Sequence, residues 1–276
     1  MDEVLSVRGL SKRYGPGCPA CYEQTGPRFE TNLCPGCGSV VAAHDLSFNL
    51  YQGEILGIMG ESGSGKSTAV KCLYFDEEPS AGSAQFFDQG EAYQLFDLNK
   101  AQQRRLANQR FGMVYQNPHL GLNFDISAGG NIAERLLMSN VDNYAQIRQR
   151  AIGLLSRTEV LAERMDELPR NFSGGMQQRV QIAKALATNP PLLFLDEVTT
   201  GLDLSVQAAI LDLILEIQQQ SRTSMIVVTH DLGVIRLLAD RTLVMKYGRV
   251  IESGLTDQIL EDPQHAYTQR LVASAL

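Results

Sequence analysis

One eight-residue segment, residues 60–67 with the sequence GESGSGKS, constrains this chain more than any other feature. It fits the pattern G-x-x-x-x-G-K-[ST], and it lies between a short apolar stretch and the start of a helical pattern. Glycines let the backbone curl so that successive N–H groups surround phosphate oxygens, and the helix N-terminus adds the positive end of its dipole. The segment therefore predicts a phosphate-binding loop (P-loop) for a nucleotide such as ATP. The residues expected to bind the nucleotide are Gly60, Glu61, Ser62, Gly63, Ser64, Gly65, Lys66, Ser67 and Thr68.

Two of these residues have a predicted chemical role. Lys66 should neutralise the β- and γ-phosphates, and Ser67 should ligate Mg²⁺. A second Mg²⁺ contact is expected from Asp196, which ends the apolar stretch 192–195. Glu197 follows directly and is placed to act as the general base that polarises the attacking water.

The balance of charges narrows the classes of partner. The chain has 276 residues, with 24 Lys+Arg against 31 Asp+Glu and a formal net charge of −7. This excess of acidic residues gives no basic surface of the kind that nucleic acids select, so no nucleic-acid partner is predicted. No apolar run approaches the roughly 18 residues of a membrane span, and the acidic start of the chain is unlike a signal peptide. We therefore expect a cytoplasmic protein.

The pattern of apolar residues predicts an α/β fold in a single domain, residues 1–276. Continuous apolar runs at 192–195 and 225–228 are typical of buried parallel strands, and residues 206–217 between them have helical spacing. Strands are expected at 4–10, where the alternation is mixed, and at 46–50, which alternates as a half-buried strand does. The expected fold also includes an antiparallel β portion. Helical spacing over 97–172 predicts a helical subdomain. A hairpin and a helix are expected in the C-terminal segment 242–276.

A second glycine-containing turn decides the subclass. Ser173, Gly174 and Gly175 precede a helical pattern, so they expose N–H groups and a hydroxyl at a helix N-terminus. One nucleotide needs only one P-loop, and a second phosphate-binding turn makes sense if it serves the nucleotide of another subunit.

With these motifs the chain resembles the ATP-binding-cassette (ABC) family, whose signature is Leu-Ser-Gly-Gly-Gln. Phe172 and Met176 depart from that signature. The resemblance covers nearly the whole chain and implies an ATPase that works as a head-to-tail homodimer or a dimer with a paralogue. It also implies roles for four further residues. They are Tyr14, stacking on adenine; Gln116, sensing Mg²⁺ and the γ-phosphate; Asp203, contacting the nucleotide across the dimer; and His230, the switch residue at the γ-phosphate.

Within the family, several stretches resemble the ATP-binding subunit of the bacterial carbon–phosphorus lyase system, which degrades phosphonates. They are residues 127–135, 172–180, 238–246 and 250–271. The motif around Tyr267 and Thr268, within the last stretch, is shared with dipeptide and oligopeptide importer ATPases. The resemblance implies a soluble lyase core complex as partner, and the alternative is a pair of membrane permease subunits of a peptide or nickel importer. A repair or translation cassette is a third class, but such proteins usually carry two cassettes or a long arm.

Four cysteines form two pairs in the segment 15–40, which interrupts the expected β portion. Cys18 and Cys21 are separated from Cys34 and Cys37 by twelve residues, a spacing found in zinc knuckles. Four thiolates suit a structural tetrahedral Zn²⁺. A single iron would use the same ligands, and free or redox-active cysteines are the other alternative. We expect this insertion to protrude from the β edge, away from the P-loop. The fifth cysteine, Cys72, is predicted to be a small buried apolar residue.

Overall fold

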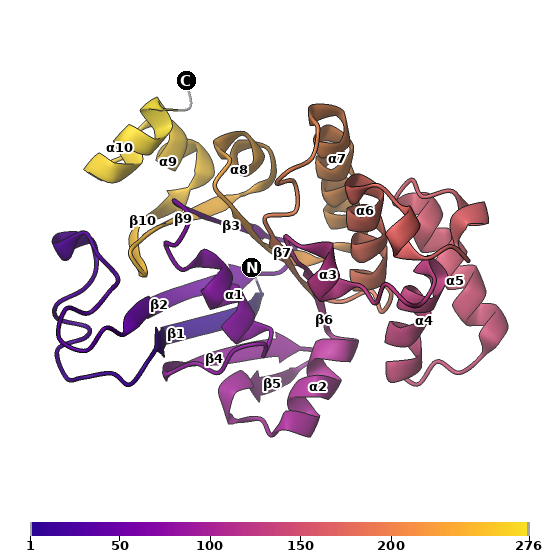
Figure 1. The fold of residues 1–276 in the computed structure, drawn as a ribbon, viewed down its shortest axis with the longest axis horizontal. Helices are drawn as coiled ribbons and strands as arrows, with labels where there is room; N and C mark the ends of the chain where they lie inside the picture. Colours follow the sequence, from indigo (N-terminus) through magenta and orange to yellow (C-terminus); the bar gives the residue numbers. More distant parts are fainter. Residues whose placement is uncertain (1, 275–276) are drawn as a thin grey trace. The chain divides into compact units, whose positions relative to one another are not determined.

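The computed structural model describes residues 2–274, so Ala275 and Leu276, which end the expected C-terminal segment, lie outside the described residues. The chain divides into two compact units. The first comprises residues 1–98 and 226–276, and the second comprises residues 99–225. Figure 1 labels most of their helices and strands. Among the described residues, no helix has the length and apolar character needed to cross a membrane.

The first unit contains a four-stranded antiparallel sheet in the order β2-β1-β4-β5. Leu46, Phe48 and Leu50 of β2 are buried while Ser47 is exposed, so the alternation in the sequence does mark a half-buried strand. The insertion with the cysteine pairs connects β1 to β2 and includes the short helix η1. The bounds are β1 (Glu3–Tyr14), η1 (Pro27–Phe29), β2 (Val40–Tyr51), β4 (Ala81–Asp88), β5 (Glu91–Gln94) and η2 (Leu95–Asp97).

The other strands of the first unit run in the order β10-β9-β3-β8, with β3 parallel to β9 and β9 antiparallel to β10. All five residues of β3 and all six of β8 are buried, as expected for apolar runs without alternation. The P-loop lies between β3 and α1. The bounds are β3 (Ile55–Met59), α1 (Lys66–Leu73), β8 (Ser224–Thr229), α8 (Leu232–Leu238), β9 (Arg241–Lys246), β10 (Arg249–Leu255), α9 (Thr256–Glu261) and α10 (Ala266–Ala273).

The second unit is mostly helical and contains two parallel paired strands, β6 and β7. Phe111 of β6 and Phe194 of β7 pack edge to face in its core, with ring centroids 5.7 Å apart. The bounds are α2 (Lys100–Gln109), β6 (Phe111–Val114), α3 (Pro118–Gly121), α4 (Ala128–Met138), α5 (Tyr144–Arg157), η3 (Ala162–Arg164), η4 (Pro169–Asn171), α6 (Gly174–Ala185), β7 (Leu192–Asp196) and α7 (Leu204–Ser221).

Candidate functional site

The P-loop curls tightly because two of its glycines sit where no side chain fits. Gly65 has φ +102°, and a Cβ added to it would lie 1.8 Å from the carbonyl oxygen of Ala42. Gly60 has φ +150°, and its Cβ would lie 2.2 Å from the carbonyl oxygen of Met245. Only glycine meets both demands, since it tolerates the left-handed region and close backbone approach. The glycine pattern therefore encodes the curvature that the motif requires.

Two polar groups make this loop suited to phosphate. Lys66 is buried, and its Nζ donates hydrogen bonds to the carbonyl oxygens of Gly60 (2.8 Å) and Glu61 (3.0 Å), which holds the ammonium group over the loop. The buried hydroxyl of Ser64 has no hydrogen-bond partner among the described residues. A buried polar group without a partner is costly, and an anionic ligand with acceptor oxygens would satisfy it. The donors of this loop thus fit the phosphates of a nucleotide.

Two contacts around the P-loop were not predicted from the sequence. The backbone N–H of Glu61 donates to the Tyr267 hydroxyl at 3.2 Å, and the N–H of Gly248 donates to the Ser64 carbonyl at 2.9 Å. Tyr14 ends β1, and its side chain is 39% exposed. Its hydroxyl is hydrogen-bonded to Thr68 of α1, while partial burial raises the pKa of the Tyr14 hydroxyl. The predicted adenine-binding residue therefore lies beside the P-loop helix.

In the second unit, Asp196 is the last residue of β7 and Glu197 follows it directly, as the sequence predicted. Asp196 is buried, and Glu197 has φ +49°, a left-handed conformation that is uncommon outside glycine and concentrates at functional sites. The side chain of Glu197 is held by a neighbour. Its Oε2 accepts hydrogen bonds from Gln116 Nε2 (2.9 Å) and from the Thr200 hydroxyl (3.3 Å). The structure thus brings Gln116 and Glu197, two predicted catalytic residues, into direct contact.

Helix α6 positions the residue before Gln116. The N–H of Tyr115 donates to Gln181 Oε1 at 2.6 Å, and the Tyr115 carbonyl accepts from Nε2 of Gln178 (3.3 Å) and of Gln181 (3.1 Å). The same helix begins at the predicted signature turn. Ser173 is its N-cap, and the Ser173 hydroxyl accepts from the N–H of Met176 at 3.4 Å. Gln116 and the signature turn are therefore connected through one helix.

The remaining predicted residues lie at or next to the N-termini of helices. A Cβ on Gly175 would lie 2.7 Å from Val206 Cγ1, so this glycine is also required for packing against α7. Asp203 is the N-cap of α7, where hydrogen bonds from the Val206 N–H and from Ser205 lower the pKa of its carboxyl. His230 is exposed and lies between β8 and Asp231, the N-cap of α8. His230 belongs to the first unit with Tyr14 and the P-loop, and the other predicted residues belong to the second.

The four cysteines of the insertion converge on one point. Their sulfur atoms all lie within 4.8 Å of one another, with Sγ–Sγ distances of 3.6 Å for Cys18–Cys21, 3.6 Å for Cys18–Cys34 and 3.4 Å for Cys21–Cys37. A disulfide would need about 2.05 Å. Four sulfurs at about 2.3 Å around a tetrahedral Zn²⁺ would be about 3.8 Å apart, close to the observed spacing. The donor set therefore fits a tetrahedral thiolate-bound metal.

One expectation about this insertion is wrong. It does not lie away from the P-loop, because Asn32 Nδ2, from the loop between the two cysteine pairs, donates a hydrogen bond to the Gly63 carbonyl at 3.3 Å. The insertion is long enough to return toward β3, and no sequence pattern indicates the direction of that return. Cys72 is fully buried in α1, as predicted, and burial raises the pKa of its thiol to about 11.

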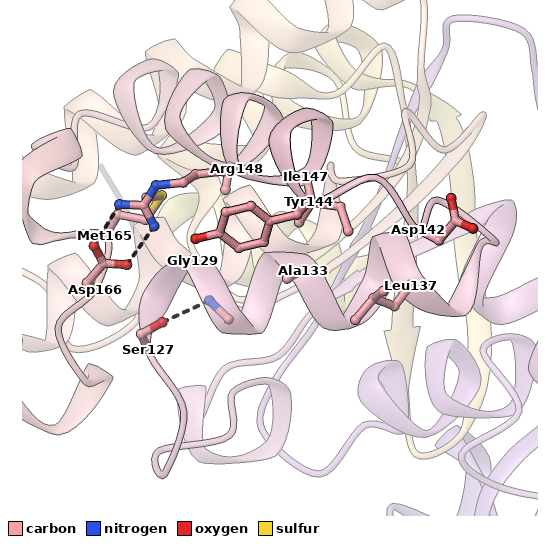
Figure 2. Close-up of a pocket in the computed structure, with 12 residues that line it drawn as sticks. Ser127, Gly129, Ala133, Leu137, Asp142, Tyr144, Ile147, Arg148, Met165 and Asp166 are labelled. Atoms are coloured by element: carbon pink, nitrogen blue, oxygen red, sulfur yellow. Dashed lines mark hydrogen bonds and ion pairs between the residues drawn. The ribbon is translucent and has the colours of Figure 1, made fainter.

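The second unit also contains a cavity of about 330 Å³ between α4 and α5. Figure 2 shows the bidentate salt bridge between Arg148 of α5 and Asp166, in which the nitrogen–oxygen distances are 2.8 and 3.0 Å. Leu137 and Tyr144 line the same cavity and remain exposed. The cavity is therefore an accessible, largely apolar hollow with a charged pair at one side.

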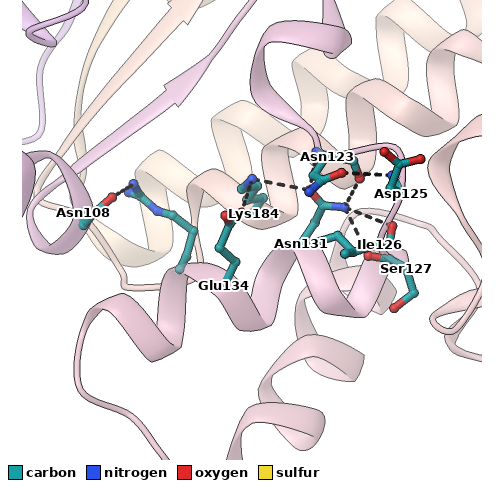
Figure 3. A network of polar contacts seen from close by, with 9 residues as sticks. Asn108, Asn123, Asp125, Ile126, Ser127, Asn131, Glu134 and Lys184 are labelled. Atoms are coloured by element: carbon teal, nitrogen blue, oxygen red, sulfur yellow. Dashed lines mark hydrogen bonds and ion pairs between the residues drawn. The ribbon is translucent and has the colours of Figure 1, made fainter.

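Helix α4 beside this cavity is tied to α6 by a buried asparagine. Asn131 Nδ2 donates to the carbonyls of Asn123 (2.8 Å) and Ser127 (3.1 Å), while its Oδ1 accepts from the Asn123 N–H (2.8 Å) and from Lys184 Nζ (3.3 Å). Lys184 also pairs with Glu134 at 2.9 Å. Figure 3 shows this network, which joins the segment after α3 to the helix that carries the signature turn.

Comparison with known proteins decides the family. The family profile described as ABC transporter matches residues 43–200, a span that includes the P-loop, Gln116, the signature turn and the strand ending in Asp196. The chain belongs to the ABC transporter family. It is an ABC-type ATPase subunit with the α/β fold of that family, as the sequence motifs predicted.

Individual relatives refine the resemblance. The chain is 50% identical over 232 residues to the putative phosphonates utilization ATP-binding protein PhnK of Escherichia coli strain K12, covering 84% of this chain and 90% of the relative. It is 34% identical over 274 residues to the di/tripeptide transport ATP-binding protein DppF of Pseudomonas aeruginosa strain UCBPP-PA14, covering 99% and 79%. Among solved structures, a dimeric post-hydrolysis state of the ATP-binding cassette MJ0796 bound to ADP and Pi matches with a TM-score of 0.76 at 26% identity, covering 91% of this chain and 98% of the other.

Proposed function

We propose that this chain is the ATP-hydrolysing subunit of a phosphonate-utilisation system and couples ATP turnover to a carbon–phosphorus lyase complex. The observation that carries the proposal is the 50% identity to the phosphonates utilization protein over most of both chains. The peptide-transport relatives match at 34–39% identity over similar spans. The higher identity to the phosphonates utilization protein favours a partner-binding surface like that of this relative over one like that of the peptide-transport proteins.

The proposed hydrolysis uses the residues that the sequence motifs assign. The P-loop from Gly60 to Thr68 would bind the triphosphate, and Ser67, Gln116 and Asp196 would supply the oxygen ligands that Mg²⁺ prefers. Magnesium-bound ATP contributes the reactive phosphoanhydride. Glu197 orients the attacking water and accepts its proton. Lys66 and His230 stabilise the charge that develops on the γ-phosphate, and Tyr14 stacks on the adenine.

The geometry at Gln116 suggests how hydrolysis is held in check. Gln116 Nε2 occupies one lone pair of Glu197 Oε2 at 2.9 Å, and the Thr200 hydroxyl approaches the same oxygen. These bonds occupy the oxygen through which Glu197 would take a proton from water. Gln116 would also be a ligand of Mg²⁺ when the metal is bound, so one side chain would serve both the cofactor and the base.

The second phosphate-binding turn completes the site in a head-to-tail dimer, of this chain with itself or with a paralogue. Ser173, Gly174 and Gly175 of one subunit then contact the γ-phosphate on the P-loop of the other, and Asp203 lies at the same junction. The dimeric form of the MJ0796 cassettes supports this arrangement. The γ-phosphate of ATP would join the P-loop of one subunit to the signature turn of the other. Hydrolysis would remove this link, so ATP turnover would close and open the dimer in a cycle.

The partner docks on the helical second unit, at the cavity between α4 and α5. Tyr144 is 73% exposed and Leu137 is 55% exposed beside the cavity, and such apolar groups at a hollow mark protein contact sites. Asn131 and Lys184 then connect this surface to α6, which holds both Tyr115 and the signature turn. The alternative function, the ATPase of a dipeptide, oligopeptide or nickel importer, would place permease subunits on the same surface.

We further propose that Cys18, Cys21, Cys34 and Cys37 bind one structural Zn²⁺. The sulfur spacing supports this, and the N–H of Cys18 donates to Cys21 Sγ at 3.1 Å, a bond that a thiolate would accept. Four protein ligands leave no open position for catalysis. Elemental analysis should give about one zinc per chain, lost in the Cys34→Ser, Cys37→Ser double variant. Metal-free protein with four alkylatable thiols would contradict the site, and iron in place of zinc would change only the metal.

Affinity purification tests the proposed partner. The tagged chain, isolated without detergent from cells that grow on a phosphonate as phosphorus source, should co-purify with soluble lyase subunits identified by mass spectrometry. Leu137→Glu should abolish this co-purification. Leu237→Glu is the matched control, because Leu237 is a helical leucine of α8 with a similar exposed fraction of 50%. Recovery of permease subunits from the membrane fraction, with none from the lyase, would support the importer instead.

A further inference from the structure

The cysteine insertion is fastened to the strands that surround the P-loop. Val41 of β2 packs against Cys21 and Cys34, so the start of β2 forms part of the small core around the sulfurs. Tyr22 stacks on His44 with ring centroids 4.3 Å apart. On the other side, Arg249 Nη2 of β10 donates to the Tyr22 carbonyl at 2.6 Å. The insertion is therefore held against both β2 and β10.

The same two strands bear directly on the P-loop. The Ala42 carbonyl, one residue after Val41, fills the space that a side chain on Gly65 would occupy. Gly248, which precedes Arg249, donates its N–H to the Ser64 carbonyl at 2.9 Å. A change in the insertion can therefore reach the P-loop through backbone neighbours on either side.

Asn32 makes the most direct link. Its backbone carbonyl accepts from the Val41 N–H at 2.8 Å, which fixes this residue beside the sulfur core. Its side-chain Nδ2 then donates to the Gly63 carbonyl at 3.3 Å. A Cβ on Gly63 would meet no atom of the described residues within 4 Å, so the loop is open on the side to which this Cβ would point. The side chain of Asn32 contacts the loop at this open residue.

We propose that Asn32 is a positioning residue for the P-loop and that the metal in the four-cysteine site acts through it to preorganise nucleotide binding. This inference rests on the metal site proposed above. The Gly63 carbonyl and the Ser64 N–H belong to one planar peptide unit. Holding the carbonyl fixes that plane within the turn in which the Ser64 N–H donates to the Glu61 carbonyl at 3.2 Å. A loop that is already ordered loses less conformational entropy when the nucleotide binds.

Binding of Mg²⁺-ATP to the isolated chain, measured by calorimetry, tests this role without relying on hydrolysis. Asn32→Ala should keep its metal and weaken ATP binding by about 2- to 10-fold, the effect of losing one ordinary hydrogen bond. Asn32→Asp preserves the side-chain shape but removes the donor, so it should weaken binding at least as much. The matched control is Gln24→Ala, an exposed amide of the same insertion, which should bind as the wild type does. In steady-state assays KM for ATP should rise while kcat at saturation stays within about twofold.

A second arm separates this role from the metal site itself. Stripping the metal from the wild type should weaken ATP binding to the level of Asn32→Ala, and stripping it from Asn32→Ala should add little, because both changes remove one restraint. Fully additive losses would show that the metal does not act through Asn32. Unchanged affinity in a folded, metal-loaded Asn32→Ala chain would overturn the positioning role. Protein purified without any metal would refute the metal site, and the two Asn32 variants would still decide the role of the side chain.

Discussion

Replacing Gly65 by alanine should damage the chain far more than the same change at a loop glycine of similar backbone conformation. Gly65 has φ +102°, and the added Cβ would lie 1.8 Å from the Ala42 carbonyl oxygen. Ala42 cannot retreat easily, because its neighbours Val41 and Ala43 pair with β1 at Arg13 and Lys12. Gly90, in the turn between β4 and β5, has φ +83° and would place its Cβ in open space. Alanine at either site would therefore strain the backbone, but only alanine at Gly65 would also clash with a neighbouring atom.

Left-handed backbone costs an alanine about 1–2 kcal/mol relative to glycine, and overpacking typically adds about 1–3 kcal/mol. We therefore expect the free energy of unfolding to fall by about 1–2 kcal/mol in Gly90→Ala and by about 2–5 kcal/mol in Gly65→Ala. Urea titration followed by circular dichroism measures both. Calorimetry should show ATP binding retained by Gly90→Ala and lost by Gly65→Ala. Equal destabilisation with intact ATP binding in both variants would refute the assigned role of Gly65.

Three further changes test other contacts. Gln116→Ala removes a proposed Mg²⁺ ligand, and this loss should outweigh the release of Glu197 from its 2.9 Å bond, so phosphate release should slow about 10- to 100-fold while ATP still binds. An unaltered rate would exclude Gln116 from the site. Burial raises the pKa of the Cys72 thiol to about 11, so the reactive thiolate is scarce at pH 8 and increases as the pH rises. Mass spectrometry should therefore find Cys72 alkylated by iodoacetamide only after unfolding. Rapid labelling of the native protein would contradict the burial of this thiol. Asn131→Ala removes a buried amide and its hydrogen bonds to Asn123, Ser127 and Lys184, so the free energy of unfolding should drop by about 1–3 kcal/mol in urea titration. No measurable loss would contradict the network in Figure 3.

The P-loop, the strand ending in Asp196 and the start of the helix after Ser173 could be predicted from the sequence, because each is a local pattern of a few residues. Glycine spacing dictates the curl of the loop, and an apolar run followed by two carboxylates marks a buried strand with a polar end. The spacing of the two cysteine pairs likewise predicted one four-sulfur site, and the four sulfurs do lie together. In these places local chemistry and fold agree.

The contacts that support the site could not be predicted. Asn32 and Gly63 are 31 positions apart, Glu61 and Tyr267 are 206 apart, and Tyr22 and Arg249 are 227 apart. Each joins a side chain to a backbone group of another element, so it depends on tertiary packing and leaves no repeating pattern. The direction of the insertion was mispredicted for the same reason. Asparagine is common in loops, and nothing near Asn32 distinguishes a structural hydrogen bond from an ordinary solvated side chain.

The central claim, that Glu197 is the base of an ATPase that closes as a dimer on its nucleotide, is tested most directly by Glu197→Gln. The amide keeps the shape of the side chain but cannot take a proton from water, so hydrolysis should fall by about 10²–10⁴-fold. With Mg²⁺-ATP, light scattering coupled to size exclusion should then find a stable dimer, while the wild type returns to monomer as ATP is consumed. Near-normal hydrolysis by Glu197→Gln, or a variant that binds ATP and remains monomeric at every concentration, would contradict the account.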